Sequence, residues 1–140
     1  MRWDSLGEFC ALGESLTFLA DVKNNSRARV LGQAVDAATQ YILDEGRSPS
    51  RKVGEPDNRN SHYWFARYWA NALATQNSDG ELAAHFAPIA KALVDGEDAI
   101  LAELAEVQGM AADLGGYYRT NADQTAEVMR PSATLNAIIN

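Results

Sequence analysis

Residues 61–76 read Ser-His-Tyr-Trp-Phe-Ala-Arg-Tyr-Trp-Ala-Asn-Ala-Leu-Ala-Thr-Gln, the most aromatic stretch of this 140-residue chain. Its large side chains recur at spacings that place them on neighbouring positions of a helix surface. They are Tyr63, Trp64, Phe65, Tyr68, Trp69 and Leu73. Such a stretch is more often the central helix of a core than an aromatic ligand site. We therefore expect the other elements to pack around it.

Two further helices are expected on the amino-terminal side of this stretch. The first is capped by Asp4 or Ser5 and ends at Asn24-Asn25, and the second runs from there to Gly46, a residue type favoured just beyond a helix. Their apolar stripes are Leu6, Phe9, Leu12, Leu16 and Leu19, and Val30, Leu31, Ala34, Ala38, Tyr41 and Ile42. Cys10, the one cysteine, lies in the first stripe, so we expect a small buried hydrophobe and no intramolecular disulfide.

Helical periodicity continues on the carboxyl-terminal side. Asp79 is placed to cap a fourth helix, in which Pro88 predicts a kink or a break. A fifth helix is expected from about Glu97 to Gln108. The tail holds two short helical stretches, around 122–129 and 132–139. The pattern therefore predicts an all-α single domain over residues 1–140, with five main helices and a short helical C-terminal tail. A short strand in an irregular segment stays open.

Bulk properties exclude several classes of protein. Hydrophobic residues make up 46% of the chain and charged residues 22%, as in ordinary soluble domains. The formal net charge of −7 argues against a general nucleic-acid binder, whose affinity comes from a basic surface. No apolar run approaches the roughly 18 residues of a membrane span. The first residues do not resemble a signal peptide, so we expect a cytoplasmic protein without a membrane or nucleic-acid partner.

One long segment, residues 46–60, breaks every periodicity and carries unusual charge. It has two prolines and two glycines, which predicts an irregular loop. Four basic residues against two acidic ones give it a net charge of +2, whereas the rest of the chain, with 8 basic and 17 acidic residues, has −9. Local ion pairs with Glu55 and Asp57 are one explanation. The other is an anion site in which Arg51, serine hydroxyls and backbone amides bind phosphate oxygens, joined by Arg2 if the amino terminus folds near the loop.

This loop and the residues after it contain distinctive motifs: Ser48-Pro-Ser-Arg-Lys-Val-Gly-Glu55, Asp57-Asn-Arg59 and Ser61-His62. Here the sequence resembles the C-terminal region of monomeric NADP-dependent isocitrate dehydrogenases. Further matching segments are Arg2-Trp-Asp-Ser-Leu-Gly-Glu-Phe9, Tyr68-Trp-Ala70, Phe86-Ala-Pro-Ile-Ala-Lys-Ala-Leu93, Asp113-Leu-Gly-Gly-Tyr-Tyr118 and Met129-Arg-Pro-Ser-Ala-Thr134. They follow the family's order and spacing over nearly the whole chain.

The resemblance implies a helical part of the smaller domain that contributes to an NADP pocket. Residue by residue, it assigns cofactor binding to Arg2, Asp4 and Arg51, with arginines selecting the 2′-phosphate. It suggests the same for Lys52, while Asn58, Arg59 and His62 are further candidates; for these four, a structural role in holding the loop is the open alternative. It implies that the isocitrate-binding, metal-binding and catalytic residues lie upstream, so that the divalent metal belongs to the full-length enzyme and this chain holds no complete active site.

Three interpretations remain open at this point. The first is a module that keeps a weak or partial NADP site. The second is a non-catalytic module that self-associates as a homodimer through Trp64, Trp69 or the tail residues Leu135, Ile138 and Ile139. The third is one part of a split enzyme, whose partner is a missing catalytic fragment.

Overall fold

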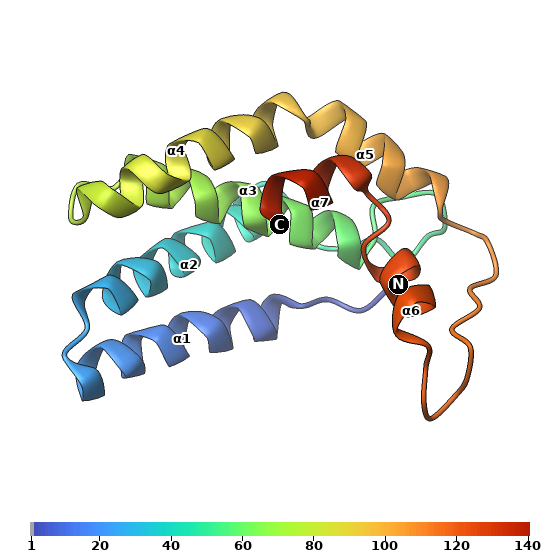
Figure 1. Ribbon diagram of the computed structural model, residues 1–140, viewed down its shortest axis with the longest axis horizontal. Helices are drawn as coiled ribbons and strands as arrows, with labels where there is room; N and C mark the ends of the chain where they lie inside the picture. Colours follow the sequence, from blue (N-terminus) through green and yellow to red (C-terminus); the bar gives the residue numbers. More distant parts are fainter. Residues whose placement is uncertain (1) are drawn as a thin grey trace.

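The computed structural model describes residues 2–140, which form seven helices and no strand. The helices are α1 (Leu6–Lys23), α2 (Ser26–Asp44), α3 (Asn58–Thr75), α4 (Gly80–Asp95), α5 (Glu97–Glu106), α6 (Ala122–Met129) and α7 (Ala133–Ile139) (Figure 1). The predicted all-α fold, with five main helices and a short helical tail, is confirmed. The short strand left open by the sequence does not occur within residues 2–140.

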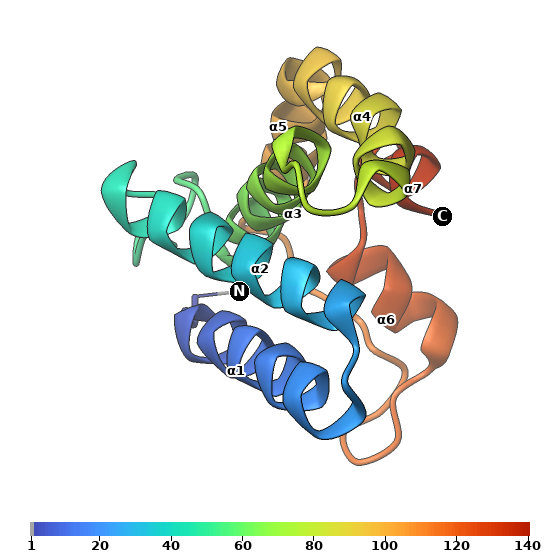
Figure 2. The same cartoon turned by 90° about the vertical axis from the view of Figure 1, so that its left-hand side faces the viewer.

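The main helices pack in chain order. Helix α1 forms a hairpin with α2, α2 packs on α3, and α3 packs on α4. Helix α1 therefore lies at one edge of the molecule, with α2 as its neighbour, as the turned view shows (Figure 2). Helix α7 folds back onto α4 and α5. None of the described helices is long and apolar enough to cross a membrane.

Helix α3 is the centre of the core, as its aromatic sequence predicts. Tyr63 and Leu73 are completely buried, and Trp64 and Phe65 are nearly so. The three aromatic residues pack with Val35 and Ile42 of α2, with Leu93 of α4, and with Ile100 and Leu104 of α5. Leu73 packs with Val30 and Ala34 of α2. The Tyr63 hydroxyl donates a hydrogen bond of 2.8 Å to the Leu93 carbonyl, so the one polar atom of this buried ring is satisfied.

The face that α1 buries differs from the predicted stripe. The buried residues are Phe9, Gly13 and Ala20, whereas Leu12 and Leu19 are exposed. At Gly13 a Cβ atom would lie 2.3 Å from the Asp36 carboxylate and 3.3 Å from Val35, so the small residue allows α2 to approach closely. Cys10 was expected to be buried, and this was wrong, because the packing through Gly13 turns it towards solvent.

Two boundaries also differ from expectation. Helix α4 continues through Pro88 without a break, and Pro88 lies on its exposed face. Helix α3 begins at Asn58, not Ser61, because Asp57 and Asn60 form a capping box around its first turn. The irregular segment predicted over 46–60 therefore ends at Asp57, and its last three residues are helical.

Candidate functional site: the basic loop

The segment between α2 and α3 is a compact loop whose two ends are defined by local hydrogen bonds. At its start Gly46 has a φ of 63°, and the amide of Arg47 donates to the Ile42 carbonyl at 2.8 Å, which closes the end of α2. At its end the Asp57 carboxylate accepts from the Arg59 amide at 2.9 Å. Across the middle, the Ser50 amide donates to the Pro56 carbonyl at 2.8 Å.

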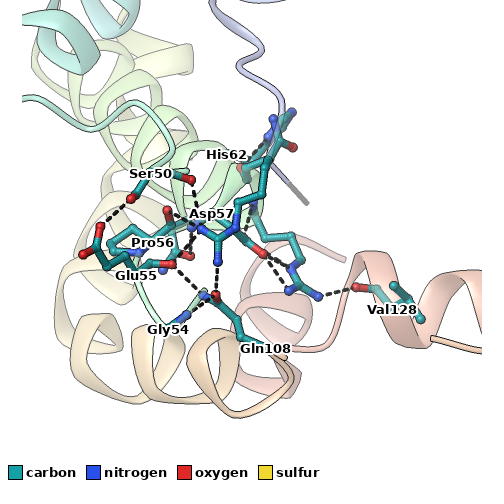
Figure 3. Close-up of polar contacts among 12 residues, drawn as sticks. Ser50, Gly54, Glu55, Pro56, Asp57, His62, Gln108 and Val128 are labelled. Atoms are coloured by element: carbon teal, nitrogen blue, oxygen red, sulfur yellow. Dashed lines mark hydrogen bonds and ion pairs between the residues drawn. The ribbon is translucent and has the colours of Figure 1, made fainter. Parts of the chain in front are cut away.

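The amino-terminal segment of the chain lies against this loop, and Arg2 binds its backbone. The Arg2 Nη1 atom donates to the carbonyl oxygens of Ser50 and Glu55, each at 3.0 Å, and of Pro56 at 3.2 Å (Figure 3). A guanidinium suits this task, because its fixed donors point at several acceptors at once. Arg2 thus lies near the loop, as the anion-site hypothesis required, and it contributes by holding the loop's shape.

Gln108, just after α5, completes this arrangement from a third segment. Its Oε1 atom accepts from Arg2 Nη2 at 2.5 Å and from the Gly54 amide at 3.2 Å, and its Nε2 donates to the Glu55 carbonyl at 3.0 Å (Figure 3). Both ends of the amide side chain are therefore used. Sequence reasoning did not identify Gln108, because a glutamine at a helix end carries no signal of a contact with residues more than fifty positions away.

Below the loop, Asp57 and Arg59 form a buried ion pair. Arg59 Nη2 lies 2.6 Å from Asp57 Oδ2, and both side chains are less than a tenth exposed. Burial raises the pKa of Asp57, but the hydrogen bonds from the Arg59 side chain and amide outweigh it and hold the pKa below its usual range. Arg59 Nη1 also donates to the Val128 carbonyl at 2.8 Å, which ties α6 to the start of α3.

Other candidates also have structural contacts. Asn58 is buried, and its Nδ2 donates to the Trp3 carbonyl at 3.0 Å and to the Ser5 hydroxyl at 2.9 Å. His62 is exposed, with Nδ1 3.0 Å from the Asn58 carbonyl oxygen. For Asn58 and Arg59 the structure therefore supports the alternative of holding the segment in place.

Arg47, the first cation of the loop, is also engaged. Its guanidinium lies 3.8 Å from the centre of the Trp64 ring, a cation–π contact, and 3.4 Å from Glu45. The Tyr68 hydroxyl donates to the same Glu45 carboxylate at 2.5 Å, and this hydrogen bond is the main cause that lowers the pKa of Glu45. Arg47 is therefore held against the core and is not directed outward.

Among the four basic residues of the loop, Arg51 and Lys52 are the two that remain exposed at the surface. Both are exposed, and Arg51 makes no hydrogen bond or ion pair within residues 2–140. Lys52 lies 3.7 Å from Glu55 in an exposed pair, a kind that contributes about 0–1 kcal/mol and exchanges readily. Asp4 is exposed at the start of α1, where its carboxylate accepts from the Leu6 amide at 3.0 Å. The geometry thus presents two outward cations on a braced loop, a suitable arrangement for an anion.

Comparisons with known proteins identify relatives over the whole chain. Residues 1–140 match the family described as monomeric isocitrate dehydrogenase. The chain is 54% identical over 139 residues to the isocitrate dehydrogenase [NADP] of Azotobacter vinelandii, and 52% identical over 140 residues to that of Corynebacterium efficiens. It is 51% identical over 139 residues to isocitrate dehydrogenase [NADP] 2 of Mycobacterium tuberculosis. These matches cover 99–100% of this chain but 19% of each relative, so the chain spans about a fifth of their length.

Proposed function

The chain belongs to the monomeric isocitrate dehydrogenase family, and from this premise we propose that it forms part of the pocket for the 2′-phosphate of NADP. In this proposal Arg51 and Lys52 bind the phosphate, and Arg2 fixes the loop that carries them. The Asp4 carboxylate repels a phosphate but accepts hydrogen bonds from hydroxyl groups, so in this proposal it binds a hydroxyl of the cofactor.

The observation that carries the proposal is the state of Arg51. Its side chain is exposed and has no partner within residues 2–140, although the loop around it is held by Arg2 and Gln108. A preorganised backbone lowers the entropy cost of ordering the binding groups, and the unpaired guanidinium has its donors available for phosphate oxygens. The relatives' names give NADP as their cofactor, the nicotinamide dinucleotide distinguished by that 2′-phosphate.

Catalysis belongs, in this proposal, to parts of the enzyme outside this chain. Oxidative decarboxylation of a 2-hydroxy acid uses a divalent metal, which polarises the hydroxyl and stabilises the enolate, together with a base and a proton donor. Within residues 2–140 no three His, Cys, Asp or Glu side chains come together as a metal site. We propose that the residues described here bind the cofactor, and that the catalytic groups come from a part corresponding to the other four-fifths of the relatives' length.

Calorimetric titration of NADPH at low salt, with NADH as the control, tests the proposal. Wild-type chain should bind NADPH in preference to NADH, and Arg51→Ala should weaken NADPH binding about tenfold or more, as expected for losing one charged hydrogen bond. Arg119→Ala is the matched control, since Arg119 is exposed and its side chain makes no hydrogen bond or ion pair within residues 2–140. Equal NADPH affinity in wild type and Arg51→Ala would refute the role of Arg51.

The outer face of α1 supports a second candidate function, self-association without a ligand. Four exposed apolar residues, Leu12, Phe18, Leu19 and Val22, fall within an arc of about 120° at 3.6 residues per turn. The opposite face of α1 is buried against α2, so the helix is apolar on both faces. Helices of this kind are usually covered by protein on both faces. Of the seam residues suggested by the sequence, only Trp64 is ruled out, because it is 5% exposed, whereas Ile139 in the tail is 49% exposed.

Sedimentation across micromolar concentrations tests this second function. A homodimer that becomes monomeric in Phe18→Asp would support it, with Met110→Asp as a control at a different exposed apolar residue. A wild-type chain that stays monomeric over the whole range would contradict it.

A further inference from the structure

An apolar cavity of about 480 Å³ lies on the side of α3 that faces the carboxyl-terminal segment. Phe65 and Trp69 of α3 form one wall, Leu104 of α5 lies in another, and Leu135 and Ile139 of α7 form the third. Helix α7 packs on α4 and α5, and residues of α3, α5 and α7 line the cavity together, which stays partly open to solvent. Its size lies in the range of small-molecule sites, and neither Arg51 nor Lys52 borders it.

The walls are held in place by contacts that do not involve a ligand. The Glu103 carboxylate accepts from the hydroxyls of Ser132 and Thr134, at 2.5 and 2.7 Å, and this fixes the start of α7 to α5. The indole Nε1 of Trp69 donates to the Leu31 carbonyl at 3.2 Å, which leaves the ring's hydrocarbon to the cavity. The hollow is therefore a feature of the packed fold.

The charge at the cavity is opposite to that of the whole chain. The chain has a net charge of −7, yet no Asp or Glu lines the cavity, whereas Arg59 and Arg130 do. Arg59 is neutralised by Asp57 at 2.6 Å. Arg130 is exposed, and its Nη2 donates to the neutral Asn140 Oδ1 at 2.8 Å, with no carboxylate partner within residues 2–140. A positive charge therefore remains at the mouth of an apolar site.

The surroundings fit a small molecule better than a protein surface. Stable protein interfaces bury about 800 Å² on each partner. Among the lining residues the large exposed hydrophobic side chains are Met129, 42% exposed, and Ile139, 49% exposed. Two half-exposed side chains are too little for such an interface, but a hollow of this volume encloses an alkyl chain or an aromatic ring.

We propose that this cavity binds a small amphipathic carboxylate, with its apolar body between α3 and α7 and its carboxylate at Arg130. The apolar walls bind the body through burial of hydrocarbon surface. The Arg130 guanidinium binds the carboxylate through charge-assisted hydrogen bonds and selects an anion over a neutral molecule of the same length. The proposal does not depend on NADP binding, because the two sites share none of their ligand-binding residues.

Titration with decanoate below its micellar concentration, followed by carbon-13 methyl signals of Leu104, Leu135 and Ile139, tests the site. Saturable shifts of these methyl groups are expected, with an affinity for decanoate at least fivefold above that for decanol. Arg130→Gln should remove this preference and leave decanol binding unchanged. Arg119→Gln, the matched control, should leave both affinities unchanged.

A second variant tests the cavity independently of charge. Ala66 borders the cavity on α3, so Ala66→Leu should fill part of the hollow and weaken decanoate and decanol alike, with the helical circular dichroism signal retained. Absence of saturable shifts in the wild type would overturn the proposal. Equal affinities for decanoate and decanol, or methyl shifts that follow protein concentration as in a dimer contact, would overturn it as well.

Discussion

Removal of the Arg2 side chain should loosen the basic loop while the helical core keeps its stability. In Arg2→Ala the carbonyls of Ser50, Glu55 and Pro56 lose a charged donor that lies 3.0–3.2 Å away. Hydrogen bonds to charged groups contribute about 1.5–3 kcal/mol, and Arg2 is only half-buried, so we take about 2 kcal/mol for the set. That amount shifts the opening equilibrium of the loop by about thirtyfold.

Amide hydrogen exchange measured by NMR reads this opening at single residues. The Ser50 amide donates to the Pro56 carbonyl and the Gly54 amide to Gln108 Oε1, so both should exchange about thirtyfold faster in Arg2→Ala. Amides in the middle of α3 should keep their protection, because the core contacts are unchanged. Gln108→Ala should expose the Gly54 amide more than the Ser50 amide.

The control for charge is Arg119→Ala, which removes one positive charge but no side-chain hydrogen bond or ion pair within residues 2–140. It should leave both loop amides protected. Wild-type exchange rates for Ser50 and Gly54 in Arg2→Ala would show that Arg2 does not hold the loop. If α3 amides accelerate equally, the effect is on global stability and not on the loop.

Three further predictions concern stability. Arg59→Ala leaves Asp57 buried without its guanidinium, so urea unfolding should show a loss of about 3–5 kcal/mol. Hydrogen bonds from the hydroxyls of Ser132 and Thr134 lower the pKa of Glu103. The ionised carboxylate therefore stabilises the fold above the ordinary pKa of a glutamate, and this stabilisation is lost as pH falls through the lowered pKa. In thermal melts, Glu103→Gln should remove the loss of stability that Glu103 causes at acid pH. Burial raises the pKa of Tyr63 to about 12, so stability should fall as pH rises from about 10 to 12, and Tyr63→Phe should flatten that fall.

The sequence predicted the helical elements well, because their periodicity and caps are local. The Asp79 carboxylate accepts from the Leu82 amide at 3.0 Å, as its position before an apolar stripe predicts. The aromatic stretch is the core, because side chains of that size find enough burial only at the centre of a domain this small. The tail helices α6 and α7 follow the predicted ranges to within one residue.

The errors arose where packing between helices decides the outcome. The buried face of α1 is set by the close approach of α2 at Gly13, which periodicity does not reveal, and so Cys10 and Leu12 face solvent. Pro88 is tolerated because it lies on the exposed side of α4.

The candidate site was predicted only in part, for a similar reason. The basic loop and Arg51 could be found from composition, charge and resemblance. The partners that shape the loop could not, because Arg2 and Gln108 reach it from positions about fifty residues away in sequence. Local ion pairs explain part of the loop's charge, because the buried Arg59 pairs with Asp57, but they do not account for Arg51, which makes no ion pair within residues 2–140.

The most direct test of the proposed function is an NMR titration of nitrogen-15-labelled chain with adenosine 2′,5′-bisphosphate, with adenosine 5′-monophosphate as the control. We expect saturable amide shifts in residues 46–57, centred on Arg51 and Lys52, with the bisphosphate and much weaker shifts with the monophosphate. Equal shifts with both compounds, or shifts confined to the helices away from this loop, would contradict a 2′-phosphate site in the basic loop.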